Sequence, residues 1–203
     1  MPEGQGAPGQ PLADEPVSWP VSESRDLHRD DWVVAFRSDT VTRPDHPELP
    51  FRRLVLETPG AVMVLAVDGE ERVVVLRQYR HPVKGRLVEL PAGLLDVPGE
   101  DPVLGAQREL REEAALQAEH WERLLTVYPS PGISAETHTI FLATGLSEAD
   151  RGDFALEHEE ADMSVERVPM ADLLEAVLDG SVRGAPVALA VLAYDVKRRR
   201  RSE

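Results

Sequence analysis

The strongest pattern in the chain is a pair of continuous apolar runs near its middle. Residues 61–67 (AVMVLAV) and 72–76 (RVVVL) are rich in β-branched side chains, which predicts strands buried on both faces. Asp68-Gly69 between them predicts a tight hairpin turn. Shorter apolar segments bounded by Pro, Asp and His predict further strands, at residues 32–36, 38–42, 51–57, 87–90, 123–128, 137–144 and 163–168.

After residue 100 the apolar residues recur at the spacing of a helix instead. Asp101 is a good N-cap and Pro102 suits the first helical position, so a helix is predicted from there to about Ala115. Two more helices are predicted at residues 170–179 and 186–199. Many strands with few helices favour an α+β fold, a mixed sheet sandwich flanked by helices, over a βαβ array. Four apolar positions of the first helix share one face, namely Val103, Ala106, Leu110 and Ala114.

Composition narrows the possible functions. The 203 residues include 37 acidic and 22 basic ones, which gives a net charge of -15. The negative electrostatic field of such a chain repels nucleic-acid polymers. The absence of cysteine excludes disulfides, thiol catalysis and Cys-ligated zinc. No window approaches the ~18 apolar residues of a membrane span, and the N-terminus lacks the order of a signal peptide. We therefore expect a cytoplasmic protein whose partner is neither nucleic acid nor membrane.

The two ends of the chain differ from its middle. Residues 1–25 are rich in Pro, Gly and acids, so we expect a disordered tail there. Residues 26–58 carry the first short strands, and residues 59–203 form the main domain with its C-terminal helix. The basic run at residues 197–201 is interpreted as the solvated end of that helix, which the helix dipole favours.

Carboxylates are concentrated in the first predicted helix. Glu109 and Glu113 are four residues apart, so they lie one turn apart on the same edge, with Glu112 nearby, and they repel each other. They border the apolar face and would point toward a sheet edge, where unpaired carboxylates are costly. A hard divalent cation would remove that cost, and the backbone carbonyl of Ala92 in the turn at residues 91–93 could supply another oxygen. The pattern indicates a Mg²⁺ or Mn²⁺ site for phosphoryl chemistry; a solvated acidic face partnered by Arg108 is the alternative.

These residues resemble the Nudix box, G-x5-E-x7-R-E-U-x-E-E-x-G-U, in which U is aliphatic. The matching positions are Gly93, Glu100, residues 108–113 (RELREE) and residues 115–116. The spacing from Gly93 to Glu100 is one residue longer than in the family pattern, and Ala115 replaces the final glycine. If that position has a left-handed backbone, Ala costs on the order of 1 kcal/mol. Neither departure removes a metal ligand.

The resemblance extends beyond the box to the ADP-ribose pyrophosphatase subfamily, of the actinobacterial type. Residues 77–81 (RQYRH) and 88–93 (VELPAG) look like that subfamily's approach to the box. Pro131 lies near the subfamily's distinguishing proline, and residues 157–162 (EHEEAD) resemble its acidic loop. The similarity covers residues 32–196 and implies a Nudix fold, with a small N-terminal antiparallel sheet that is exchanged between subunits. We therefore expect a homodimer.

The family's functional residues can be carried over by position. The resemblance implies water attack on the diphosphate of ADP-ribose, giving AMP and ribose 5-phosphate. It places the metal on Glu109, Glu112, Glu113 and the Ala92 carbonyl, and pairs Glu100 with Arg108 beside Gly93. The candidate catalytic carboxylates are Glu159, Glu160 and Glu112, with the general base expected from the first two. For the substrate, Arg80 and Arg77 would bind phosphate, Trp32 would stack on adenine, and Pro131 and Gly132 would shape a loop over the terminal ribose.

Alternative functions stay open at this point. A Nudix hydrolase could act on another nucleoside diphosphate derivative, such as a nucleotide sugar or a dinucleoside polyphosphate. A catalytically silent Nudix domain could bind ADP-ribose as a regulator, although the complete set of Arg108, Glu109, Glu112 and Glu113 argues against it. An acidic structural protein with a coincidental helix is the third alternative.

Overall fold

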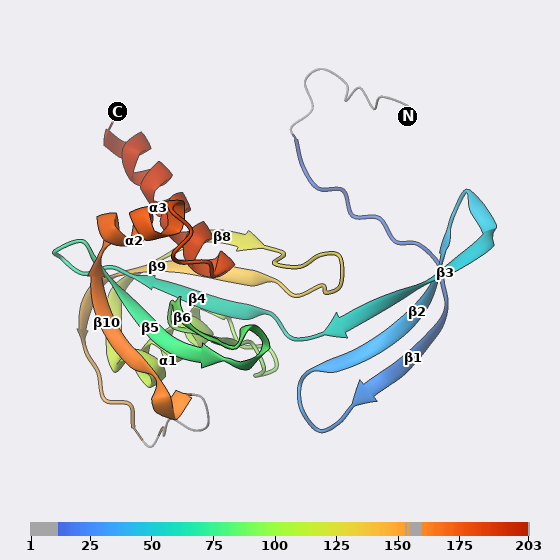
Figure 1. Ribbon diagram of the computed structural model, residues 1–203, viewed down its shortest axis with the longest axis horizontal. Coiled ribbons are helices and arrows are strands. Elements are labelled where there is room, and N and C mark those ends of the chain that lie inside the picture. Colours follow the sequence, from blue (N-terminus) through green and yellow to red (C-terminus); the bar gives the residue numbers. More distant parts are fainter. Residues whose placement is uncertain (1–11, 153, 155–159, 203) are drawn as a thin grey trace.

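The computed structural model describes residues 12–152, 154 and 160–202. Within this part of the chain the strands form three sheets, and three α-helices pack against two of them (Figure 1). None of the helices in the described residues has the length and apolar character needed to cross a membrane. The α+β architecture expected from the sequence is confirmed.

A small antiparallel sheet stands apart from the rest of the molecule (Figure 1). It contains β1 (Val21–Arg29), β2 (Ala35–Arg43) and β3 (His46–Glu57), in that spatial order. β1 begins inside the segment expected as a disordered tail, so that expectation is wrong for residues 21–25. The reason is that β1 is exposed along its whole length and is held by polar contacts, such as the 2.6 Å hydrogen bond that Ser24 donates to Asp39, instead of by an apolar pattern.

The body of the protein contains the other two sheets. The four-stranded sheet has the order β7-β4-β9-β8, with β7 at Ala92–Leu94, β4 at Ala61–Ala66, β9 at His138–Glu148 and β8 at Leu116–Val127. The three-stranded sheet has the order β10-β5-β6, with β10 at Ser164–Pro169, β5 at Arg72–Arg80 and β6 at Gly85–Glu89. β4 pairs in parallel with β9 and antiparallel with β7, so its sheet is mixed.

The predicted hairpin at Asp68 is only partly present. Its turn forms, because the Asp68 side chain accepts hydrogen bonds from the backbone N–H groups of Glu70 and Arg72, both at 3.0 Å. The flanking strands then separate: after a single bridge between Val67 and Val73, β4 and β5 enter different sheets. A strand that is buried on both faces can pair with its neighbour in the sequence or lie in the interior of a separate sheet. The apolar runs alone do not distinguish these two arrangements.

Three helices complete the body: α1 (Pro102–Ala114), α2 (Met170–Leu178) and α3 (Ala185–Ser202). Alternate residues of β4 pack on opposite sides. Val62 and Val64 share a fully buried cluster with Leu110 of α1, whereas Leu65 belongs to a second cluster with Val191 of α3. The single turns η1 (His81–Val83) and η2 (Glu160–Asp162) lie in the connections. The central strand thus fixes α1 against one face of the four-stranded sheet.

Candidate active site

α1 begins and ends as its sequence predicts. The Asp101 side chain accepts a 3.1 Å hydrogen bond from the N–H of Val103, and Pro102 occupies the first turn. The helix ends at Ala115, whose φ of 54° and ψ of 40° are left-handed, so Ala occupies the conformation that favours the glycine of the box. β8 starts at the next residue. The helix is therefore held tightly at both ends.

Glu109 and Glu113 face the sheet from α1. They are 8% and 5% exposed, respectively, because they adjoin the apolar stripe that packs on β4. The carboxylate of Glu113 accepts a 2.7 Å hydrogen bond from the backbone N–H of Ala92. Nearly complete burial of two carboxylates on one helix edge is unfavourable unless cations or N–H donors compensate it.

Gly93 provides the space for Glu109. A Cβ atom at Gly93 would lie 2.1 Å from Cδ and Oε1 of Glu109 and 2.6 Å from Oε2, so only glycine leaves room for this carboxylate. The turn expected at residues 91–93 is in part the short strand β7, in which Gly93 pairs with Val62 of β4. That pairing places β7 under the helix edge and brings two parts of the box together.

Arg108 is the internal cation of the site. Its Nη1 lies 2.6 Å from Oε1 of Glu109 and 3.2 Å from Oε2 of Glu112, and its Nη2 lies 3.5 Å from Oε2 of Glu100. The pairing expected between Glu100 and Arg108 is present. Burial lowers the pKa of Arg108, but the charges of Glu109, Glu112 and Glu100 and a side-chain contact with Glu100 outweigh it and raise the pKa above its ordinary value. The guanidinium is therefore permanently charged.

A cavity of about 560 Å³ opens beside these carboxylates. Glu109, Glu112 and Glu113 line one side of it together with Gly93. Other sides are lined by residues of several elements, among them Trp32, Met63, Gln78, Arg80, Asp96, Glu136 and His138. The volume falls within the range of small-molecule pockets. The three glutamates of α1, called here the acidic wall, and the arginine Arg80 in the same lining suit an anion that is bound together with cations.

The two arginines of β5 have different positions. Arg80 lines the cavity and forms ion-paired hydrogen bonds with Glu89 of β6, at 2.8 and 3.1 Å. Arg77 pairs with Glu166 of β10 at 2.7 Å and does not line this cavity. Side chains alternate between the faces of a strand, so Arg80 shares a face with Gln78 while Arg77 points the other way. The structure does not bring the two arginines together.

The remaining predicted residues differ in whether they line the cavity. Trp32, in the loop between β1 and β2, lines the cavity, whereas Pro131 and Gly132 do not. Glu159 lies outside the described residues. Glu160 begins η2, but its side chain is also outside them.

Sequence reasoning missed four polar residues of the cavity wall: Gln78, Asp96, Glu136 and His138. Gln78 is 4% exposed on β5. Nε2 of His138 lies 3.3 Å from Oε1 of Glu136. Glu136 lies two residues before His138, the first residue of β9, and this close spacing of a carboxylate and an imidazole was the available signal.

The acidic wall does not form a closed metal cage as its side chains stand. Among the described residues, no three His, Asp or Glu side chains surround a common point, and the carboxylates of Glu109 and Glu112 both contact Arg108. The donor set consists of carboxylate oxygens beside a strand backbone, which suits a hard cation such as Mg²⁺ or Mn²⁺. The residues are therefore chemically fitted to such an ion.

Comparison with known proteins identifies the family of this chain. The family model described as NUDIX domain matches residues 57–187, so the chain belongs to the Nudix family. An ADP-ribose pyrophosphatase of Mycobacterium tuberculosis strain H37Rv is 43% identical over 161 residues, 79% of this chain and 76% of the relative. A methanol dehydrogenase activator of Bacillus methanolicus is 36% identical over 151 residues, 74% of this chain and 75% of the relative.

A solved structure supports the architecture independently. The crystal structure of an ADP compounds hydrolase superposes with a TM-score of 0.71, covering 92% of this chain and 98% of the other. At 20% sequence identity this similarity concerns the fold alone. The Nudix fold expected from the sequence is confirmed, and divalent cations are typical of the family.

Proposed function

We propose that this Nudix protein hydrolyses the diphosphate linkage of ADP-ribose to AMP and ribose 5-phosphate. The observation that carries the proposal is the buried carboxylate pair of Glu109 and Glu113, which is seated against β7 through Gly93 and opens onto a substrate-sized cavity. The 43% identical relative described as an ADP-ribose pyrophosphatase supports the choice of substrate.

A divalent cation is part of this proposal. Glu109, Glu112, Glu113 and the carbonyl of Ala92 would hold it, as Mg²⁺ or Mn²⁺. When bound, such an ion polarises phosphoryl oxygens and lowers the pKa of an attacking water. Glu112 and Glu109 both contact one cation, the guanidinium of Arg108. The same carboxylates therefore attract positive charge to the edge of the cavity.

The other side chains position the substrate. The guanidinium of Arg80 binds a phosphate oxygen through charge-assisted hydrogen bonds, and Glu89 holds its orientation. Trp32 stacks on the adenine ring from the rim of the cavity. Pro131 and Gly132 act indirectly, because their loop leads to Glu136 and then into β9, which begins at His138.

A carboxylate from the region after β9 acts as general base in this proposal. Glu159 and Glu160 are the candidates, and Glu112 belongs to the same catalytic set through the acidic wall. A base within hydrogen-bond reach of the attacking water contributes roughly 100- to 10,000-fold to a rate. Glu160→Gln and Glu159→Gln, measured separately, would assign the role to whichever variant loses the rise of kcat with pH.

We also propose that the active form is a homodimer with two functional parts per subunit. Residues 21–57 form the small sheet, which extends the expected N-terminal part by residues 21–25. Residues 59–203 form the catalytic domain. Exposed apolar side chains on the small sheet, such as Leu27 and Leu54, support a role in subunit contact. The family match beginning at residue 57 supports the same division.

The decisive experiment measures AMP release from ADP-ribose with Mg²⁺, and again after chelation and metal replacement. Glu113→Gln should lower kcat/KM by at least ~100-fold. The matched control is Glu175→Gln, an exposed glutamate on α2 outside the cavity, which should retain activity. A panel of nucleotide sugars and dinucleoside polyphosphates tests the substrate. If a member of the panel is hydrolysed faster than ADP-ribose, that compound becomes the assigned substrate. Tight binding of ADP-ribose without hydrolysis would indicate a regulator.

A further inference from the structure

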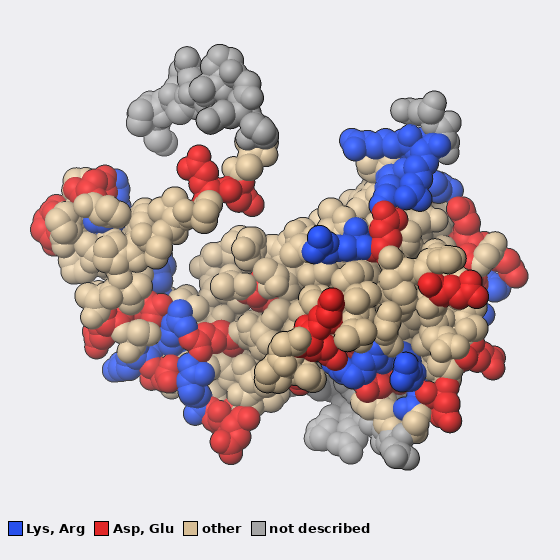
Figure 2. All heavy atoms as spheres, turned by 180° about the vertical axis from the view of Figure 1, so that it is seen from behind, with Lys and Arg blue, Asp and Glu red and all other residues tan. Residues whose placement is uncertain are grey.

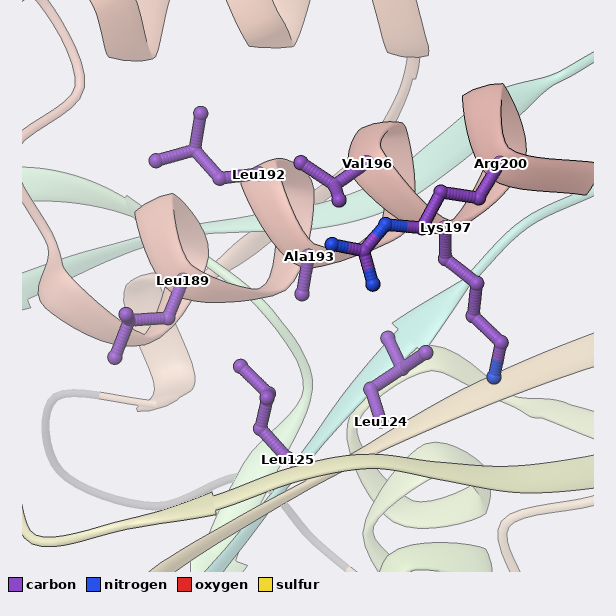
Figure 3. Close-up of a pocket in the computed structure, with 8 residues that line it drawn as sticks. All are labelled: Leu124, Leu125, Leu189, Leu192, Ala193, Val196, Lys197 and Arg200. Atoms are coloured by element: carbon purple, nitrogen blue, oxygen red, sulfur yellow. The ribbon is translucent and has the colours of Figure 1, made fainter. Parts of the chain in front are cut away.

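A second concave surface lies on the body, between α3 and β8. This groove of about 560 Å³ is lined by Leu124 and Leu125 of β8 and, on α3, by Leu189, Leu192, Ala193, Val196, Lys197 and Arg200 (Figure 3). Leu124 and Leu125 point from the strand toward the helix and Ala193 points back toward them, whereas Leu192 is directed away from the strand (Figure 3). Leu189, Leu192 and Val196 remain 37–48% exposed. Packing among the described residues therefore leaves an apolar stripe uncovered.

One cation at the end of the groove differs from its neighbours. Lys197 and Arg201 pair with Glu122, Arg199 pairs with Asp195, and Arg198 pairs with Glu71. Arg200 forms no ion pair within the part of the chain that the structure describes, and its side chain extends along the groove (Figure 3). The chain has a net charge of -15 and is therefore rich in carboxylates. Because Arg200 lies beside an apolar groove, the complementary partner is an apolar segment that carries a carboxylate.

The N-terminal arm, defined here as residues 12–17 (LADEPV), has this composition. Leu12 and Val17 are 106% and 72% exposed, and Asp14 and Glu15 lie between them. The arm leaves the small sheet just before Trp19, which is held edge-on against Phe51. The described arm is extended and lies far from the α3 of its own chain (Figure 1).

We propose that the N-terminal arm of one copy of this chain occupies the α3–β8 groove of a second copy. Leu12 and Val17 cover the apolar stripe, and Asp14 or Glu15 pairs with Arg200. The lengths agree: from Leu189 to Arg200 the helix rises about 16 Å, and the extended arm spans about 20 Å. Figure 2 shows Lys and Arg side chains gathered at the projecting end of α3, and the acidic arm of a chain with a net charge of -15 is complementary to this basic end. The proposal does not depend on the substrate.

The natural absence of cysteine allows a direct test. Val17→Cys and Val196→Cys are combined in one chain, oxidised gently and separated on a non-reducing gel. Both side chains are exposed, so the substitutions leave the fold intact, which thermal unfolding verifies. The matched control combines Val17→Cys with Leu178→Cys, at an exposed apolar position on α2 that does not line the groove. We expect a covalent dimer only for the groove pair, with Arg200→Glu lowering its yield at least tenfold at low salt.

Charge reversal on the arm provides the specific check. Asp14→Arg with Glu15→Arg should restore the cross-linking yield of the Arg200→Glu protein. A monomer that has lost both thiols would mean that the arm folds back on its own chain and would overturn the second-copy assignment. Equal cross-linking of the control pair, or retention of free thiols in the groove pair, would also refute it.

Discussion

Gly93→Ala is the sharpest available perturbation of the carboxylate site. The added Cβ would lie 2.1 Å from Cδ and Oε1 of Glu109, whereas non-bonded heavy atoms need about 3.5 Å. The shortfall is about 1.4 Å. The backbone of Gly93 is not left-handed, so β7 itself accepts alanine without strain. The carboxylate, which ends a flexible side chain, must therefore move out of its position.

The size of the effect follows from that displacement. A misplacement of about 1 Å costs on the order of 100-fold in rate, or ~2.7 kcal/mol of transition-state stabilisation. We expect Gly93→Ala to lower kcat/KM for ADP-ribose by about that factor and to require more Mg²⁺ for half-maximal rate. Thermal unfolding should change by only a few degrees, because the clash is relieved by rotating one side chain.

A matched glycine provides the control. Gly69 in the turn after β4 has no atom within 4 Å of an added Cβ and no left-handed φ, so Gly69→Ala should keep its activity within about twofold. Steady-state AMP release across a Mg²⁺ series measures both variants. A folded Gly93→Ala protein with kcat/KM within threefold of the natural protein would contradict the role assigned to Glu109.

Three further predictions address stability and binding. Ala115→Gly removes a left-handed alanine worth about 1–2 kcal/mol and adds unfolded-state freedom worth about 0.4–1 kcal/mol, so calorimetry should show slight stabilisation; destabilisation would refute the strain. For Asp68→Asn, burial raises the pKa of Asp68 but hydrogen bonds from Arg72 and Glu70 outweigh it and hold the pKa below 3.8. The stability that Asp68 contributes is therefore complete above its unfolded pKa and is lost as pH falls through the lower folded value. Chemical denaturation should show a deficit of about 1–2 kcal/mol at pH 7 that shrinks below pH ~4; a constant deficit would exclude the linkage. Arg80→Ala should lower kcat/KM by roughly 10- to 100-fold, while Arg77→Ala, which only breaks an exposed pair with Glu166, should change it little; equal losses would contradict their separation by strand alternation.

Local signals in the sequence were sufficient for α1 and its surroundings. The cap at Asp101, the apolar stripe around Leu110 and the four-residue spacing of Glu109 and Glu113 all depend on neighbours within a few turns of one helix. The left-handed residue at Ala115 is likewise a local requirement of the helix end. These predictions agreed with the structure because periodicity and capping act over short distances.

Long-range pairing explains what could not be predicted. Two strands that are buried on both faces can pair with each other or lie in two different sheets. β4 and β5 lie in different sheets because β4 pairs with β9 and β5 pairs with β10, and both partners are more than sixty residues later in the chain. The same choice sets which face of β5 meets the cavity, and so which arginine, Arg80 or Arg77, can reach a substrate. β1 depends on Ser24 and Asp39 meeting across strands, which an apolar pattern does not record. The positions of Glu109 and Glu113 depend on one helix, so the sequence predicts them. The positions of the cavity residues on β5 depend on the order of the strands, which the sequence pattern does not give.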